Sequence, residues 1–109
     1  MNADLIARLR AQLGGPRDGA LLRFSLGTAL LANGDAAGAV CAFRQAVDFD
    51  ATYSAAWKML GKALADSGDS SAAIDAYRKG LEVAGARGDK QVEKEITVFL
   101  RRLEKTEKH

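Results

Sequence analysis

The sequence has few of the residues on which metal and catalytic sites depend. It contains one cysteine, Cys41, and one histidine, His109. A single cysteine cannot form an internal disulfide, and a four-ligand zinc site needs several Cys or His residues. The thiol also lacks the usual histidine base, because His109 ends a Lys/Glu-rich tail that is expected to be disordered. We therefore expect no metal, no cofactor and no enzyme activity, and a reducing, cytoplasmic location.

The chain also lacks strand signals and any strong imbalance of charge. Its one proline is Pro16, and long β-branched or aromatic alternations of period two are missing. Residues 1–13 contain no uninterrupted apolar run that resembles a signal-peptide core or a membrane span. The net charge of +2 is too small to gather phosphates. These absences predict an all-α protein that binds neither nucleic acid nor membrane.

What remains is the composition of one folded domain. Hydrophobic residues make up 48% and charged residues 28% of the 109 positions. A chain of this length buries well over half of the surface that its unfolded form exposes. One hydrophobic core, or one short stack of repeats, is therefore expected.

The chain repeats itself at an interval of 34 residues. Residues 26–30 (LGTAL) align with residues 60–64 (LGKAL), and residues 39–44 (AVCAFR) align with residues 73–78 (AIDAYR) without a gap. An internal repeat of this length indicates a stack of similar helical units.

The interval and its pattern resemble the tetratricopeptide-repeat family. That family repeats every 34 residues with the pattern W-x2-L-G-x2-Y, followed by A-x3-F and a later A and P. Residues 57–61 and the pair Ala73 and Tyr77 match this pattern best. The resemblance divides the chain into a first repeat, residues 20–53, and a second repeat, residues 54–87.

Four positions depart from the family pattern. Arg23 replaces the tryptophan of the first repeat, and Gly80 replaces the late alanine of the second. Ala51 and Gly85 stand where each repeat would close with proline. These departures affect above all the turns between repeats.

The two ends of the chain are expected to cap the stack. Residues 1–19 are predicted to be a capping helix or half repeat, the second helix of an incomplete preceding repeat. Residues 88–109 are predicted to be a solvating helix and tail. The apolar faces expected on these two helices are Leu5, Leu9 and Leu13, and then Val92, Ile96, Phe99 and Leu103.

Within each repeat, glycines carry most of the local information. Gly27 and Gly61 fall in the middle of the first helix, where glycine costs about 1 kcal/mol relative to alanine. We expect close contact with the second helix at Ala39 and Ala73 to compensate. The Gly-Asp pairs that follow each first helix predict a helix end and then an N-capping aspartate.

The predicted fold is therefore an all-α, short right-handed solenoid of antiparallel helix hairpins, with about six helices. The hairpins are expected at residues 20–48 and 54–83. The four aromatic residues on helical stripes are interpreted as core rather than as a ligand box: Phe43, Trp57, Tyr77 and Phe99.

The resemblance implies a function as well as a fold. Members of the family mostly bind peptide or helix segments in a groove lined by the first helix of each repeat. The groove positions of the family correspond here to Leu21, Phe24, Thr28, Leu31, Ala55, Lys58, Lys62 and Ala65, with Ser25 and Met59 nearby. We expect the partner to be another protein or peptide, with an apolar pocket from the first repeat beside a basic ledge from the second.

Alternatives stay open from the sequence alone. The N-terminal helix would in one interpretation partly cover Leu21, Phe24 and Leu31, and Lys58 and Lys62 would merely be solvated. Self-association through the outer face or an uncovered end would make the chain an oligomerisation or scaffold module. The lysine-rich clamp with which some members hold acidic chaperone tails is not expected, because Phe24 and Thr28 occupy its first two positions.

Overall fold

The computed structural model describes residues 2–107, which form helices and turns and contain no strand. His109, which the sequence predicted to be disordered, lies outside the described residues. The helices of the described part are α1 (Asn2–Ala11), α2 (Ala20–Ala32), α3 (Ala36–Phe49), α4 (Ser54–Asp66), α5 (Ser70–Arg87) and α6 (Lys90–Glu107). The prediction of an all-α protein with about six helices is confirmed.

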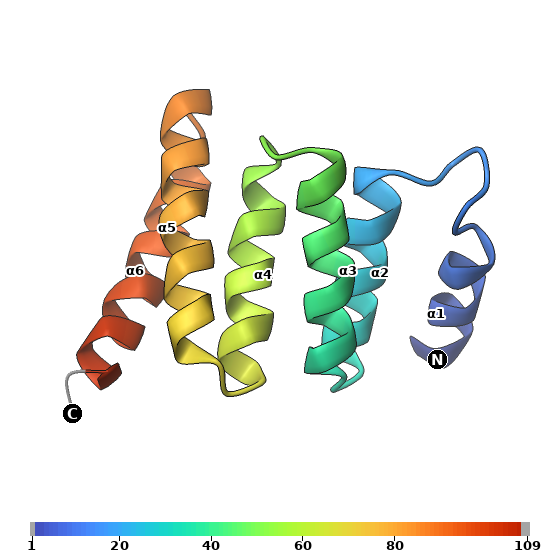
Figure 1. Cartoon of the computed structure of the whole chain (residues 1–109), viewed down its shortest axis with the longest axis horizontal. Helices are drawn as coiled ribbons and strands as arrows, with labels where there is room; N and C mark the ends of the chain where they lie inside the picture. Colours follow the sequence, from blue (N-terminus) through green and yellow to red (C-terminus); the bar gives the residue numbers. More distant parts are fainter. Residues whose placement is uncertain (1, 108–109) are drawn as a thin grey trace.

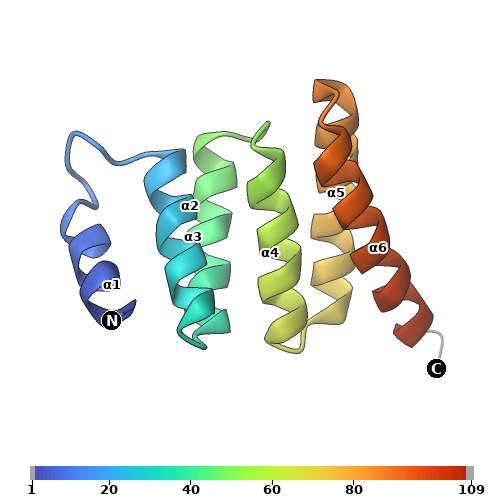
Figure 2. The same cartoon turned by 180° about the vertical axis from the view of Figure 1, so that it is seen from behind.

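The helices form a row of successive antiparallel hairpins (Figure 1). The α2/α3 and α4/α5 hairpins are the most closely packed pairs, and α3 packs on α4 to join them. Helix α1 packs on α2 at one end, and α6 packs on α5 and α4 at the other. Helices α3 and α5 lie on the near side in Figure 1, whereas α2, α4 and α6 lie on the near side in Figure 2. The molecule therefore has two layers, and we call the second of them the α2–α4–α6 face.

Both hairpins turn as the sequence predicts. Gly34 and Gly68 have φ angles of 83° and 92°, which an L side chain rarely adopts. The aspartate that follows each glycine is the N-cap of the next helix. The side chain of Asp35 accepts a hydrogen bond of 2.8 Å from the backbone N–H of Gly38, and the side chain of Asp69 accepts one of 3.1 Å from the backbone N–H of Ala72.

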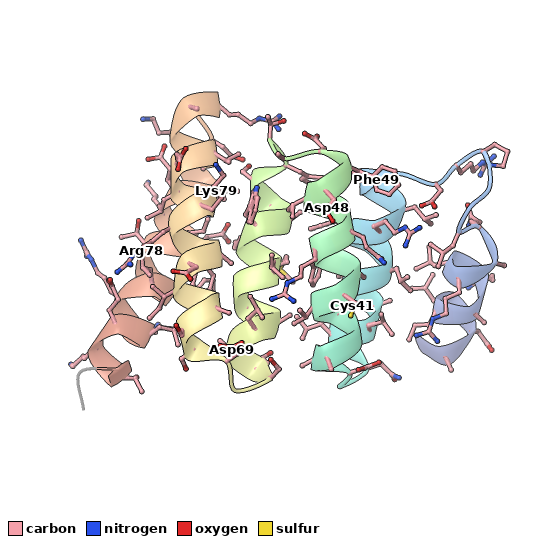
Figure 3. All side chains as sticks on the ribbon, in the orientation of Figure 1. Cys41, Asp48, Phe49, Asp69, Arg78 and Lys79 are labelled. Atoms are coloured by element: carbon pink, nitrogen blue, oxygen red, sulfur yellow. The ribbon has the colours of Figure 1, made fainter. Side chains whose placement is uncertain are left out.

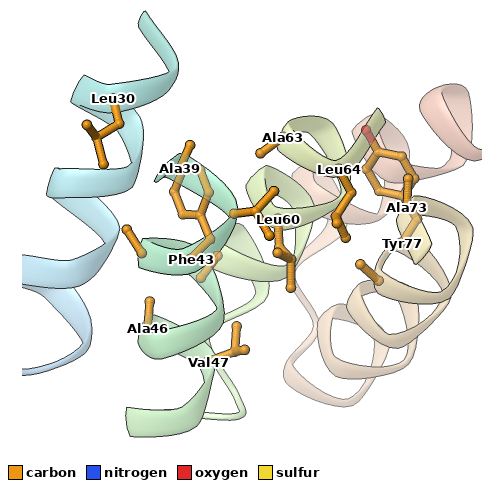
Figure 4. Close-up of a cluster of buried hydrophobic side chains, with 14 of the residues drawn as sticks. Leu30, Ala39, Phe43, Ala46, Val47, Leu60, Ala63, Leu64, Ala73 and Tyr77 are labelled. Carbon is orange, nitrogen blue, oxygen red and sulfur yellow. The ribbon is translucent and has the colours of Figure 1, made fainter. Parts of the chain in front are cut away.

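The glycines inside α2 and α4 make room for an aromatic ring. A Cβ atom added to Gly27 would lie 2.7 Å from Cε1 of Phe43, and one added to Gly61 would lie 2.5 Å from Cδ1 of Tyr77. The close helix contact was predicted, but the atoms nearest to the glycines belong to these rings and not to the alanines that the sequence suggested. Both rings are buried in the core cluster that Figure 4 shows.

The second hairpin is longer than predicted. Helix α3 ends at Phe49, one residue past the expected end, but α5 continues to Arg87, four residues past it. Gly85 does not stop α5, because glycine, unlike proline, keeps its backbone N–H and fits a helix. The helix ends instead at Gly88, whose φ is 72°. The late glycine of the repeat also has a packing role, since a Cβ atom on Gly80 would lie 2.7 Å from Cδ1 of Ile96 in α6.

The end helices bury slightly different faces from those predicted. In α1, Ile6 is buried and Leu9 packs partly against the core, as does Leu13 in the turn after the helix, but Leu5 is exposed. Ile6 and Leu9 lie one repeat interval before Val40 and Phe43 of α3, which supports the interpretation of α1 as the second helix of an incomplete repeat. In α6, Val92, Ile96 and Leu100 are buried, and Phe99 and Leu103 are partly buried.

Candidate functional site

The predicted groove residues lie on two helices of the α2–α4–α6 face (Figure 2). Helix α2 carries Leu21, Phe24, Thr28 and Leu31, and α4 carries Lys58, Met59 and Lys62. Their role in binding stays a prediction. Their surroundings differ enough, however, to separate the residues that are accessible from those already engaged.

The α2 part of this surface is apolar and centres on a stacked aromatic pair. Leu21 is 69% exposed, so α1 does not cover it. The ring of Phe24 stacks on the ring of Tyr53, with centroids 4.9 Å apart, and is tilted against Phe43. Thr28 is exposed, and its hydroxyl donates to the Phe24 carbonyl oxygen at 2.9 Å. Leu21 and the open edge of the aromatic pair are therefore the accessible apolar groups here.

Tyr53 was missed by sequence reasoning. It is the last residue of the first repeat, immediately before α4, and the repeat pattern assigns no groove role to that position. Burial, together with the nearby carboxylate of Asp50, raises the pKa of the Tyr53 hydroxyl. The sequence signal that could have identified Tyr53 was an aromatic residue directly before the first helix of the second repeat.

The α4 part of the surface is less basic than the sequence suggested. The ammonium group of Lys58 lies 3.0 Å from Oε1 of Glu95 on α6, and the lysine side chain is only 20% exposed. Lys62 is 45% exposed and lies 3.9 Å from the carboxylate of Asp66, one turn further along α4. Met59 packs partly against the core. Of the two lysines, Lys62 is the one available to a partner, and the interpretation that Lys58 is merely solvated is wrong.

A small hollow opens between α4 and α6 next to Lys62. Its volume is about 160 Å³, and its lining residues are Lys62, Ala65, Asp66, Tyr77, Phe99, Arg102 and Leu103. The rings of Tyr77 and Phe99 stack with centroids 5.9 Å apart. Burial, and to a lesser extent Asp66, raises the pKa of Tyr77 to about 12. Its hydroxyl is therefore protonated at neutral pH and can donate a hydrogen bond.

Arg23 explains the first departure from the repeat pattern. Its guanidinium holds both carboxylate oxygens of Asp18, at 2.8 and 2.7 Å, and also donates to Oε1 of Gln45 on α3. The hydrogen bonds from Arg23 and from the backbone N–H of Gly14 hold the pKa of Asp18 well below its usual range. In place of tryptophan, the arginine thus fixes the loop that connects α1 to α2.

The opposite layer offers little chemistry. Cys41 is exposed on α3 (Figure 3). Within residues 2–107, no three His, Cys, Asp or Glu side chains gather as they would around a metal ion. None of the helices in that range is both long and apolar enough to cross a membrane.

Comparisons with known proteins point in one direction. No family model matches the chain. It is 46% identical over 101 residues to a TPR repeat-containing protein of Pseudomonas aeruginosa, which covers 93% of this chain and 96% of that protein. A protein of Bordetella parapertussis with a solution structure is 46% identical and superposes with a TM-score of 0.81, and the match covers 94% of this chain and 89% of that protein. The TPR domain of Sgt2 from Aspergillus fumigatus is 25% identical and superposes with a TM-score of 0.82, and the match covers 99% of this chain and 72% of that one.

Proposed function

Because the chain belongs to the tetratricopeptide-repeat family, whose domains generally act as protein-interaction modules, we propose that it binds a peptide or helix of a partner protein without catalysing a reaction. The binding surface is the α2–α4–α6 face. The partner lies across the first helices of the two repeats and reaches the hollow beside α6.

The exposure of Leu21 is the observation that carries this proposal. A leucine that is 69% exposed on the first turn of α2 has apolar surface that only a partner can remove from water. The stacked pair of Phe24 and Tyr53 is also partly open, and both residues are in contact with the core. An exposed apolar side chain beside a partly buried aromatic pair is a suitable surface for a bulky side chain of a partner.

The charges predict what kind of segment binds. With Lys58 engaged by Glu95, Lys62 is the lysine of the predicted ledge that remains accessible. Buried apolar anchors often contribute 2 kcal/mol or more, whereas exposed ion pairs give about 0.2 to 1 kcal/mol. The partner segment should therefore be amphipathic, with one or two bulky apolar anchors and a nearby carboxylate. A purely acidic tail should bind poorly.

The test uses matched surface variants and a captured partner. A partner is isolated on the unmodified chain and titrated calorimetrically against Leu21→Gln, Phe24→Ala and Lys62→Ala. The control is Cys41→Ser, which changes an exposed residue on α3, in the opposite layer (Figure 3). Leu21→Gln and Phe24→Ala should weaken binding more than Lys62→Ala, and Cys41→Ser should not weaken it.

Salt dependence separates the two contributions. Raising the ionic strength should reduce the affinity only modestly, because salt screens the lysine contribution and leaves the apolar one intact. A steep salt dependence together with an unaffected Phe24→Ala variant would show that the wrong face or the wrong class of ligand has been chosen.

Self-association is a second candidate, and exposed apolar residues on both end helices favour it. Leu5 on α1 and Val98 on α6 are exposed at opposite ends of the row. Stacking of one copy on the next would bury them. Light scattering over a series of protein concentrations tests this, and a constant monomer mass over the whole series would exclude it.

A further inference from the structure

Tyr77 carries a hydroxyl group that its packing does not require. The equivalent position in the first repeat is Phe43, one repeat interval earlier. Both rings lie against the glycine of their own first helix, Gly27 or Gly61, and both are buried. Phe43 demonstrates that a ring without a hydroxyl fills this place, so the oxygen of Tyr77 calls for another explanation.

This hydroxyl has no hydrogen-bond partner among the residues that the structure describes. None of the hydrogen bonds found within residues 2–107 involves it, although the residue is only 2% exposed. It is not sealed in the core either, because no fully enclosed side-chain oxygen or nitrogen of the described residues lacks a partner. The residue lines the hollow between α4 and α6, and Figure 4 shows the oxygen at the margin of the buried cluster. The small exposed part of Tyr77 therefore includes its hydroxyl, and the residue lines the hollow.

The rest of the hollow combines apolar walls with a cationic rim. Ala65, Phe99 and Leu103 contribute apolar surface, and Lys62 and Arg102 contribute two positive charges. Asp66 contributes one negative charge but is 3.9 Å from Lys62, a loose pair that leaves the ammonium group accessible. The rim thus has a net charge of +1, and most of its polar groups are hydrogen-bond donors.

We propose that this hollow binds a carboxylate on an apolar stem, presented by an acidic side chain of the partner segment next to one of its apolar residues. The carboxylate accepts a hydrogen bond from the Tyr77 hydroxyl and faces Lys62 and Arg102, while the stem packs against Phe99. A monoanion is neutralised by the net charge of the rim, whereas a dianionic phosphate would leave one negative charge uncompensated in the hollow. A neutral group would leave the donors without a charged acceptor. This assignment rests on the proposed function, and it places the acidic group of the partner at Lys62 and not at Lys58.

The test uses a small probe, so that no natural partner is required. The full chain, labelled with ¹⁵N, is titrated with 3-phenylpropionate, with the neutral 3-phenylpropionamide, and with phenyl phosphate. Amide resonances of residues lining the hollow should shift with the carboxylate and much less with the amide. Tyr77→Phe should weaken carboxylate binding about tenfold or more, as expected for loss of a hydrogen bond to a charged group. Arg102→Gln should also weaken it, and Lys79→Gln on the opposite layer should leave it unchanged.

Each contrary result overturns the proposal. A carboxylate site would be excluded if the acid and the amide bound equally, if Tyr77→Phe bound the acid as well as the parent, or if the shifted amide resonances belonged to residues outside the hollow. Tighter binding of phenyl phosphate would show that the class of anion is wrong. Tyr77→Phe retains the ring that Phe43 supplies in the first repeat, and Arg102 is exposed, so both variants should fold. If the titration shows no binding but Leu21→Gln still weakens partner binding, this inference is wrong and the proposed function stands. If the probe binds but Leu21→Gln and Phe24→Ala leave partner binding unchanged, the proposed function is wrong.

Discussion

Replacing Gly61 with leucine should destabilise the fold far more than replacing its neighbour Lys62 with leucine. The Cβ atom alone would lie 2.5 Å from both Cδ1 and Cε1 of Tyr77 and 2.9 Å from its Cγ. Contacts this short do not occur between real atoms, so the ring must move. The ring has little freedom to move, because it is buried and stacks on Phe99.

The expected magnitude follows from two opposing contributions. Overpacking of a well-filled core typically costs about 1 to 3 kcal/mol, and leucine is at the upper end because it adds four carbon atoms. Leucine has a better helix propensity than glycine by about 0.8 kcal/mol, which offsets part of this loss. The net destabilisation by Gly61→Leu should be about 2 kcal/mol. Lys62→Leu changes a half-exposed position of similar helix propensity, so its effect should stay within about 0.5 kcal/mol.

Urea denaturation followed by circular dichroism measures the difference. With slopes of about 1 to 3 kcal/mol per molar for domains of this size, the midpoint of Gly61→Leu should fall by about 1 M relative to Lys62→Leu. Gly85→Ala is the matched glycine control, because no atom lies within 4 Å of the added Cβ and the residue is inside α5. It should stabilise the chain by about 0.5 to 1 kcal/mol. Equal midpoints for the two leucine variants would refute the reasoning about ring packing.

Three further predictions concern charge and proton binding. Asp18→Asn should lower the free energy of unfolding at neutral pH, because the hydrogen bond from Arg23 lowers the pKa of Asp18 in the folded protein. Below the ordinary pKa of 3.8, protonation of Asp18 weakens the same interaction in the parent chain, so the difference between variant and parent should shrink there. A double-mutant cycle between Lys58 and Glu95 should give a coupling of about 0.5 kcal/mol that declines with salt, and zero coupling would mean that the contact does not fix α6. Ultraviolet titration should show one tyrosine ionising near 12, absent in Tyr77→Phe; because its folded pKa is raised, stability present below pH 10 should be lost as the pH rises toward 12.

Much of the fold could be predicted because the information is local and repeated. The Gly-Asp pairs define turn and cap within a few residues, and the structure has both in both hairpins. The end of α5 was predicted four residues too early, because the family pattern closes its repeat with proline and this chain has Gly85. Glycine permits a helix to end but does not force it to end. Where α5 ends therefore depends on its contacts with α6.

The candidate site was predictable only in part. Helical periodicity places Leu21 and Lys62 on first helices, and this needs no knowledge of the neighbours. The engagement of Lys58 by Glu95 could not be predicted, because Glu95 belongs to a helix without a repeat counterpart. The hollow was missed for the same reason, since Phe99 and Arg102 reach Tyr77 only after α6 has docked.

The sequence by itself determined the repeat interval, the two hairpins and a close contact between helices at each helix glycine. It could do so because turns, caps and the helical stripe depend on residues that are close together along the chain. The tertiary structure alone decided how α6 lies against α4 and α5. Gly80 lets Ile96 approach α5 closely, and that approach sets which face of α6 meets Lys58 and Tyr77. Contacts between residues so far apart in sequence depend on the three-dimensional fit of whole helices, which no local pattern encodes.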